Sequence, residues 1–191
     1  MKGAIEIRWH GRGGQGTKTA ALLLAEAAFT IGMYAQGFPE YGPERMGAPI
    51  TAYNRIASSP ITVHSNIYEP DSVVIVDETL IESVDVLRGL KPGGIVLVNS
   101  SRDDRTIRRA LGDFPGRLYI INAREISEET IGSYFPNIPM LSAVVKCNAI
   151  MTDSELTACM TDSLKKKFST KPQVVQGNLE AVKRTLEELI L

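Results

Sequence analysis

The sequence predicts an α/β fold, an open and mostly parallel Rossmann-like sheet with helices on both faces and a helical C-terminal region. Strand-like runs alternate with helix-like runs, which is typical of parallel sheets covered by helices. The β-branched runs at 72–76 and 95–98 are continuous, as in strands that are buried on both faces. Four glycines stand where the first strand passes into the first helix. At 191 residues, the chain fits one domain over residues 1–191.

Four of the seven predicted strands begin in the first third of the chain. The first strand is expected at 3–9, and a helix at 17–31 follows from apolar residues at the 3.6-residue spacing. A short second strand at 33–36 precedes a loop rich in Gly and Pro at 37–49. Alternating segments at 50–56 and 61–65 predict an antiparallel pair or a sheet extension.

The remaining chain turns from strands to helices. We expect the buried strands 72–76 and 95–98 to be separated by a helix at 78–89 and a glycine turn. A short charged helix is expected at 103–111, and a last strand at 118–121 completes the predicted sheet. The C-terminal region is predicted to be helical at 123–131, 140–151, 154–168 and 173–190.

Composition narrows the class of protein. The hydrophobic fraction of 43% and charged fraction of 23% are typical of a soluble globular protein, and the net charge of -1 gives no reason to expect nucleic acid as a partner. No apolar run is long enough to predict a membrane span, and the start of the chain does not resemble a signal peptide. Two cysteines are too few for an iron–sulfur cluster, and we expect them to be buried thiols in a cytoplasmic protein.

The strand-to-helix junction at 11–16 is the first candidate site. Glycines there let the backbone approach a ligand closely, and the N–H groups at the start of the helix would face that ligand from the positive end of the helix dipole. An anion or phosphate is therefore the expected ligand. The candidate residues are Gly11, Arg12, Gly13, Gly14, Gln15, Gly16, Thr17 and Lys18.

Two common phosphate motifs fit this turn incompletely. Gly11, Gly13 and Gly16 satisfy the dinucleotide pattern G-x-G-x-x-G, but the acid expected about 20 residues later is replaced by Gln36. A P-loop needs its lysine directly after the last glycine, whereas Lys18 comes one position late and is rotated by about 100° around the helix. Tight packing of the first helix on the sheet is the structural alternative.

The loop at 38–49 is the second candidate site. It combines Gly and Pro with charged and aromatic side chains, whereas a plain loop needs only the former. Glu40, Tyr41 and Arg45 are the candidates, although a surface loop with incidental charges remains an alternative. Arg45 could pair with a glutamate of the loop or reach a phosphate, and Tyr41 could stack on an adenine or pack against another subunit.

Together the two motifs resemble the gamma subunit of the pyruvate:ferredoxin and 2-oxoacid:ferredoxin oxidoreductase family. The family's G-x-G-G-Q-G turn matches residues 11–16, and its E-Y-G-x-E-R-x-G block matches residues 40–47. The strand at 70–77 also looks like the family's next strand, and the likeness covers most of the chain. Met46 departs from the pattern, because many relatives carry a second arginine there.

The resemblance implies the activity and its partners. The family decarboxylates pyruvate or another 2-oxoacid oxidatively, transfers the acyl group to coenzyme A and reduces ferredoxin. Thiamine diphosphate, Mg²⁺ and [4Fe-4S] clusters would be held by alpha, beta and delta-type partner subunits, with no redox centre on this chain. The gamma subunit would assist coenzyme A binding and assembly. A free-standing NAD- or flavin-dependent oxidoreductase and a pure assembly module are the alternatives.

We hypothesise that the two motifs lie side by side at the carboxyl ends of the parallel strands, where open α/β sheets bind ligands. Backbone N–H groups of residues 13–17 would hold a phosphate of coenzyme A, with Arg12 and Lys18 either as charge partners or as solvated side chains. Asp77 and Asn99 end two strands and could line this crevice or cap the next helices. His10 is expected to orient the loop backbone. No residue set suggests a catalytic nucleophile, a general base or a metal site.

Overall fold

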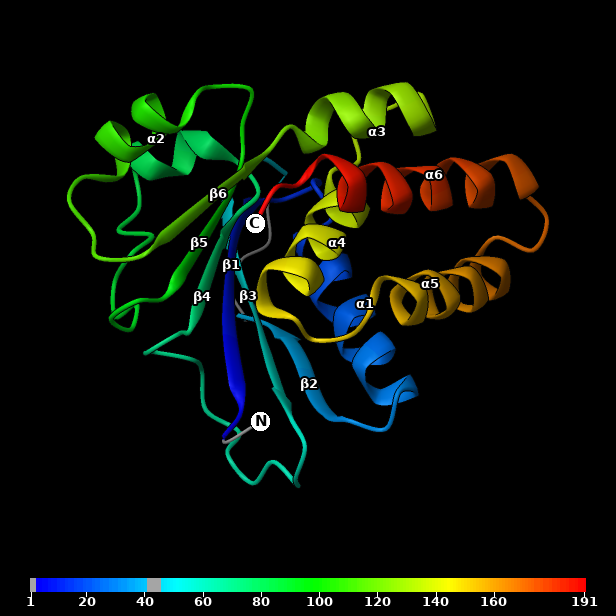
Figure 1. Ribbon diagram of the computed structural model, residues 1–191, viewed down its shortest axis with the longest axis horizontal. Helices are drawn as coiled ribbons and strands as arrows, with labels where there is room; N and C mark the ends of the chain where they lie inside the picture. Colours follow the sequence, from blue (N-terminus) through cyan, green and yellow to red (C-terminus); the bar gives the residue numbers. More distant parts are fainter. Residues whose placement is uncertain (1–2, 41–45) are drawn as a thin grey trace.

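The computed structural model describes residues 3–40 and 46–191 and forms a layered α/β arrangement (Figure 1). Its central layer is a sheet in the order β2-β3-β1-β4-β5-β6. The strands are β1 (Ile5–Arg12), β2 (Tyr34–Pro39), β3 (Pro49–Ala57), β4 (Ser72–Ile75), β5 (Ile95–Asn99) and β6 (Arg117–Ile121). The helices are α1 (Thr17–Thr30), η1 (Glu78–Glu82), α2 (Asp104–Leu111), α3 (Ala123–Ile131), α4 (Asn137–Asn148), α5 (Asp153–Lys167) and α6 (Pro172–Glu188).

Parallel and antiparallel strands divide the sheet at β1. β1, β4, β5 and β6 run parallel, as the continuous apolar runs predicted. β3 returns antiparallel to β1, with Pro49 opposite Arg12, and β2 pairs antiparallel with β3 at the edge. Because β3 runs backwards, its first residues lie beside the carboxyl end of β1.

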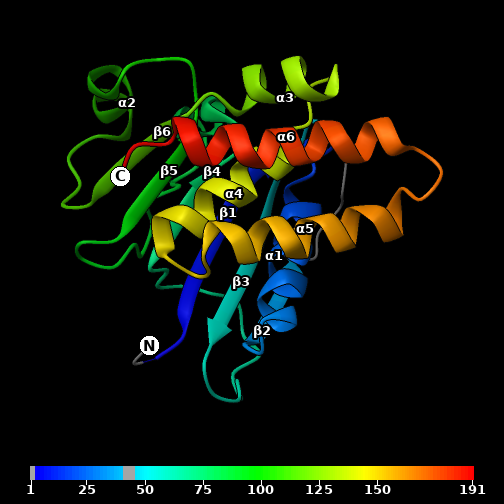
Figure 2. The same ribbon diagram turned by 45° about the vertical axis from the view of Figure 1, so that its right-hand side comes forward.

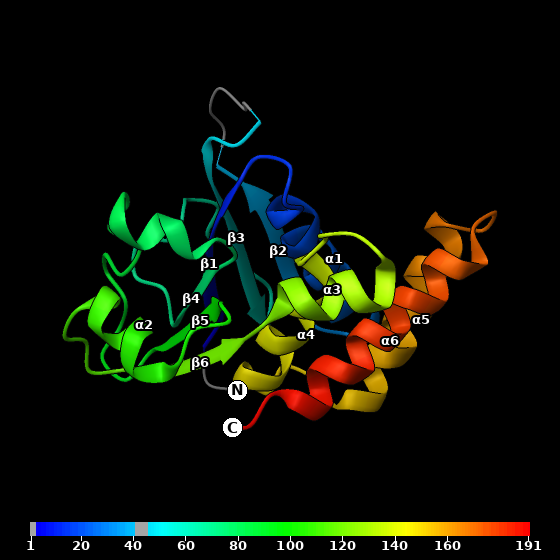
Figure 3. The same cartoon turned by 90° about the horizontal axis from the view of Figure 1, so that it is seen from above.

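Helices cover both faces of the sheet, as predicted, but unequally (Figures 2 and 3). α1 packs on β2 and β3, and α4 packs on β4, β5 and β6 of the same face. α5 and α6 lie outside α1 and α4 as a further layer, with α3 against α6. The opposite face carries η1 and α2, whose apolar side chains surround Val73, Ile75 and Val96. Both faces thus bury apolar side chains, which is the main stabilising contribution to such a sheet.

A buried polar network fixes α1 on the antiparallel part of the sheet. The indole of Trp9 donates to Asn54 Oδ1 at 2.8 Å, and Asn54 Nδ2 donates to the carbonyl of Ala21 at 2.8 Å. Gly37 allows this close approach, because a Cβ there would lie 2.7 Å from the same carbonyl oxygen. One asparagine therefore joins β1, β3 and α1, and holds α1 against these two strands.

Most predicted elements are confirmed within about three residues, and two predictions are wrong. Residues 61–65 form no strand, because Arg55 and Gln36 donate side-chain hydrogen bonds to the carbonyls of Val63 and Ser65, which a strand would use in its ladder. The expected helix at 78–89 is only the short η1 followed by turns. There the buried guanidinium of Arg8 donates to the carbonyls of Val86 and Arg88.

The boundary between β2 and the following loop also differs from the prediction. β2 continues to Pro39, beyond the expected end at Gln36, because residues 37–39 pair with Asn54, Tyr53 and Ala52 of β3.

Among the described residues, none of the helices has the length and apolar character needed to cross a bilayer.

Candidate functional site

The glycine turn, residues 11–16, links the end of β1 to the start of α1. Gly14 and Gly16 have φ angles of 97° and 77°, which favour glycine over other residues. Gly11 is needed for a different reason, because a Cβ there would lie 2.0 Å from Thr17 Oγ1. Thr17 is fully buried, and its hydroxyl finds no hydrogen-bond partner among the described residues. The tight helix packing given as the structural alternative is therefore present at Gly11, and the positive φ angles account for Gly14 and Gly16.

Gln15 holds the turn in shape from within. Its side-chain oxygen accepts from the backbone N–H of Arg12 at 2.8 Å, and its amide nitrogen donates to Asp77 Oδ2 at 2.5 Å. The backbone N–H of Gln15 also donates to the carbonyl of Arg12 at 3.2 Å. Gln15 therefore orients the turn through its own contacts, with both ends of its amide engaged inside the protein.

The end of the second motif lies against the glycine turn. Gly13 N–H donates to the carbonyl of Ala48 at 2.9 Å, and Gly47 N–H donates to the carbonyl of Gly13 at 3.0 Å. A Cβ on Gly14 would lie 2.5 Å from the sulfur of Met46, which is itself 88% exposed. The antiparallel return of β3 explains this contact, because it delivers residues 46–48 to the carboxyl end of β1.

A cavity of about 410 Å³ opens between these two turns and the start of α1. The N-cap residue of α1 is Gly16, so no side chain caps this helix, and the first turn of α1 carries no acidic residue. The N–H groups and positive dipole end at such a terminus favour an anion. The cavity is lined by Gly13, Gly14, Gly16, Thr17, Lys18, Thr19, Met46 and Ile50.

Arg12, by contrast, is occupied with contacts inside the protein. Its guanidinium donates to Thr79 Oγ1 at 2.8 Å and to the carbonyl of Gly47 at 3.2 Å, and lies 3.4 Å from Asp77 Oδ2. Thr79 in turn donates to the same carboxylate, from its hydroxyl at 2.6 Å. Arg12 thus fastens the two turns to η1, and Lys18 is the cationic side chain that lines the cavity.

The carboxylate of Asp77 accepts hydrogen bonds from Gln15 and Thr79 and forms an ion pair with Arg12. Burial opposes ionisation of its carboxyl, but hydrogen bonds from Thr79 and Gln15 and the nearby charge of Arg12 outweigh burial, so the pKa of Asp77 is lowered. It also caps η1 by accepting from the N–H of Thr79 at 3.0 Å. The capping role expected for Asp77 is therefore confirmed, and the carboxylate additionally anchors the glycine turn.

A second, smaller cavity of about 170 Å³ lies at the carboxyl ends of β4 and β5. Both Asp77 and Asn99 line it. Asn99 does not cap the next helix as expected, since Asp103 caps α2 and Asn99 Oδ1 instead accepts from the N–H of Arg124 at 3.3 Å. The guanidinium of Arg124 stacks over the ring of Tyr134 at 4.0 Å.

Three further predicted positions have different outcomes. Glu40 is described, and its carboxylate accepts from the hydroxyl of Tyr53 at 3.1 Å while its N–H donates to the carbonyl of Thr51. Tyr41 and Arg45 lie outside the described residues. The predicted stacking of Tyr41 and the predicted pairing of Arg45 therefore stay predictions.

The imidazole of His10 contacts Arg8 of its own strand, and no hydrogen bond from this ring to the loop that it was expected to orient is found among the described residues. Its Nε2 accepts from Arg8 Nε at 3.0 Å on the face of the sheet that η1 covers. Burial, and secondarily the charge of Arg8, lower the pKa of His10 to about 4. The imidazole is therefore neutral near pH 7 and acts as an acceptor that positions Arg8.

The site contains residues that the sequence did not single out. Thr79 bridges Arg12 and Asp77, and Asn137 at the start of α4 comes within 3.0 Å of the position of a Cβ on Gly16. Neither residue belongs to a motif, and each is brought to the site by a long-range contact. Polar residues just after a strand or at a helix start are the only local signal.

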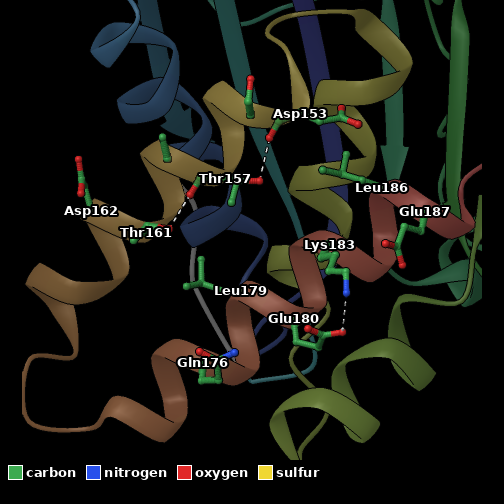
Figure 4. Close-up of a pocket in the computed structure, with 12 residues that line it drawn as sticks. Asp153, Thr157, Thr161, Asp162, Gln176, Leu179, Glu180, Lys183, Leu186 and Glu187 are labelled. Atoms are coloured by element: carbon green, nitrogen blue, oxygen red, sulfur yellow. Dashed lines mark hydrogen bonds and ion pairs between the residues drawn. The ribbon is translucent and has the colours of Figure 1, made fainter.

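A cavity larger than the one at the glycine turn lies in a groove between α5 and α6 (Figure 4). It measures about 860 Å³, and small or apolar side chains such as Ala158, Leu179 and Leu186 line it. Its charged residues are four carboxylates and one ammonium group: Asp153, Asp162, Glu180, Glu187 and Lys183. Among the described residues, no three His, Cys, Asp or Glu side chains gather as a metal site, here or elsewhere.

Comparisons with known proteins agree with the likeness seen in the two motifs. The model of the pyruvate ferredoxin/flavodoxin oxidoreductase family matches residues 6–188. The "Pyruvate/ketoisovalerate oxidoreductases common subunit gamma" of Thermococcus litoralis is 40% identical over 98% of each chain. "Pyruvate synthase subunit PorC" of Thermotoga maritima is 42% identical over 97% of this chain and 94% of its own.

Solved structures share the fold. The crystal structure of the pyruvate oxidoreductase subunit PORC of Thermotoga maritima has a TM-score of 0.85 at 39% identity, and the match covers 99% of this chain and 98% of that one. The 2-oxoglutarate:ferredoxin oxidoreductase of Magnetococcus marinus, solved with coenzyme A bound, has a TM-score of 0.75 at 20% identity. This chain covers 31% of that longer one. The chain therefore belongs to the pyruvate ferredoxin/flavodoxin oxidoreductase family, as a gamma-type subunit of an oxidoreductase complex.

Proposed function

We propose that this chain assists coenzyme A binding and assembly in a complex that decarboxylates pyruvate or another 2-oxoacid to acyl-coenzyme A and CO2. The proposed partners are alpha, beta and delta-type subunits, which would hold thiamine diphosphate, Mg²⁺ and [4Fe-4S] clusters, and ferredoxin as electron acceptor. Residues 1–191 would act as one gamma-type domain. A cytoplasmic location is supported by two buried cysteines without a disulfide.

The glycine turn carries the coenzyme A part of the proposal. The start of α1 offers backbone N–H groups beside a cavity whose described lining residues include no acidic side chain. Lys18 adds a positive charge to that lining. A phosphate group suits such a place, because it brings negative charge and several acceptor oxygens.

The rest of the site would keep the turn ready for the ligand. Gln15 and Arg12 are bound to Asp77 and Thr79, so the backbone conformation does not depend on a ligand. Residues 46–48 form the other wall through their two backbone hydrogen bonds to Gly13. In this proposal the chain binds and orients the coenzyme, and partner subunits perform the redox steps.

The strand order argues against the alternative of a free-standing NAD- or flavin-dependent enzyme. In the dinucleotide fold, a parallel strand next to the first one carries the acid that holds the ribose. Here the neighbour of β1 on that side is antiparallel β3, and Gln36 lies one strand further away in β2. The position for such an acid is therefore missing as well as its side chain.

Comparing Gly14→Asp with Gly14→Asn in the reconstituted complex tests the role of the turn. Both substitutions impose the same backbone strain at φ 97° and the same clash with Met46, so they differ in one negative charge. We expect the Asp variant to bind coenzyme A about tenfold more weakly than the Asn variant, because a carboxylate beside the helix start repels phosphate.

The readout is the dissociation constant for coenzyme A, with turnover measured at saturating 2-oxoacid. Lys18→Gln should weaken binding in the same direction, and Lys165→Gln, at an exposed position on α5, is its control. Equal affinity of the two Gly14 variants, in complexes of normal composition, would reject a phosphate role for the turn.

A further inference from the structure

A cavity distinct from the glycine turn lies where α1, α3, α4, α5 and α6 meet. It measures about 400 Å³, which is in the range of small-molecule sites. We call it the lysine cavity, and its lining is Thr19, Leu23, Ile131, Ser133, Phe135, Asn137, Ile138, Leu164, Lys167, Phe168, Lys171, Val174 and Asn178. Seven of these side chains are apolar or aromatic, and the aromatic Phe135 is 50% exposed.

Charge distinguishes this cavity from the larger groove. Among the residues that the structure describes, the charged ones in its lining are Lys167 and Lys171, with no carboxylate. Neither lysine forms an ion pair within the described residues, although Lys167 Nζ lies 5.9 Å from the centre of the Phe168 ring. The groove between α5 and α6 has the opposite balance, with four carboxylates and one ammonium group. An organic anion is therefore attracted to the smaller cavity and repelled from the larger one.

We propose that the lysine cavity binds a small amphipathic anion. Its apolar part would lie among Leu23, Phe168 and Val174, and its phosphate or carboxylate would meet the ammonium groups of Lys167 and Lys171. A volume of about 400 Å³ holds a ring or a short acyl chain. The ligand chemistry could come from a nucleotide derivative or from a fatty carboxylate.

This proposal does not depend on the proposed role of the glycine turn. Gly14 does not line the lysine cavity, so Gly14→Asp leaves the cavity intact. The two sites are neighbours, because Thr19 lines both cavities and Asn137 contacts Gly16. Coenzyme A can therefore be tested at each site with different variants.

The test titrates the full chain with 8-anilinonaphthalene-1-sulfonate, an aromatic anion that fluoresces in apolar sites. We expect one saturable site per chain. Val174→Phe fills the cavity and should weaken binding about tenfold, because the dye loses its apolar contacts. Ala158→Phe is the matched control, since it adds an aromatic ring to the larger groove, and should change the affinity less than about twofold.

Charge is tested separately, in case the larger side chain disturbs packing. Lys167→Gln with Lys171→Gln should weaken binding about fivefold and reduce its dependence on salt. Lys165→Gln with Lys166→Gln removes two positive charges from α5, the helix that carries Lys167, at positions outside the lining, and should have little effect. Circular dichroism and Tm confirm that each variant is folded.

Competition identifies the source of the natural ligand. Displacement of the dye by coenzyme A indicates a nucleotide derivative, and displacement by decanoate indicates a fatty carboxylate; either result supports the proposal. The proposal is overturned if folded Val174→Phe binds the dye as well as the natural chain, or if Ala158→Phe has the larger effect. Loss of dye binding on assembly with the partner subunits also overturns it, because the cavity would then be a subunit contact.

Discussion

His10 shows how one buried side chain couples stability to pH. The folded chain lowers the pKa of His10 to about 4, whereas the unfolded chain has an ordinary value near 6.5. As pH falls below about 6.5, the unfolded chain takes up the proton first, so stability decreases down to about pH 4. Above pH 6.5 both states are neutral at this position and the effect vanishes.

Replacing His10 removes this dependence. We expect the natural chain to lose about 2 kcal/mol of unfolding free energy between pH 7 and pH 5 through this group, and His10→Gln to lack that share of the loss. His64→Gln, at the exposed second histidine, is the control and should keep it. Urea denaturation at both pH values measures the difference, and parallel pH profiles for the natural chain and His10→Gln would contradict the assignment.

Local sequence signals determine the start of α5 more fully than that of other helices. Thr152 accepts from the N–H of Glu155, and the Glu155 carboxylate accepts from the N–H of Thr152 at 2.8 Å, which forms a capping box. We expect Thr152→Ala to cost about 1 kcal/mol of stability, because an N–H group at the helix start loses its partner. Thr157→Ala, one turn later and also exposed, should change stability by less than about 0.5 kcal/mol. Thermal denaturation compares the two, and equal losses would mean that the capping box contributes nothing.

Elements were predictable where local patterns decide them and unpredictable where distant side chains do. The buried runs of β4 and β5 and the helical spacing of α1 need no partner to be recognised. Residues 61–65 have a strand pattern, yet their carbonyls are taken by Arg55 and Gln36. No local rule assigns the carbonyls of Val86 and Arg88 to Arg8, which lies 78 and 80 positions away.

The candidate site also has a part that local sequence patterns predict and a part that depends on distant contacts. Glycines at a strand-to-helix junction predict a backbone ligand site from sequence alone. The roles of Gln15, Asp77 and Thr79 depend on tertiary contacts, since they hold the turn across 62 to 67 positions of chain. The contact of residues 46–48 with Gly13 depends on the antiparallel course of β3, which the sequence left open.

At the scale of the whole molecule, the two thiols report on global unfolding. Cys147 and Cys159 are both buried in the core formed by the sheet and the helices of one face. Burial raises the pKa of the Cys147 thiol to about 12, so little reactive thiolate forms in the folded state.

Alkylation should therefore require the whole chain to open. We expect iodoacetamide to modify both cysteines at the same slow rate, and this rate should rise with urea in step with global unfolding measured by circular dichroism. Mass spectrometry of the two cysteine peptides measures each rate. A fast, urea-independent reaction at either thiol would show that part of the helical layer opens by itself.

The contacts of Gln15 have a consequence for the rate and affinity of ligand association. Since its amide closes the turn from inside, the N–H groups at the start of α1 would need no rearrangement to bind the anion that we propose there. A preformed receptor loses little conformational freedom on capture, so more of the interaction energy appears as affinity. Association at this turn should then be limited by diffusion and electrostatic steering, with no slow conformational phase in stopped-flow traces.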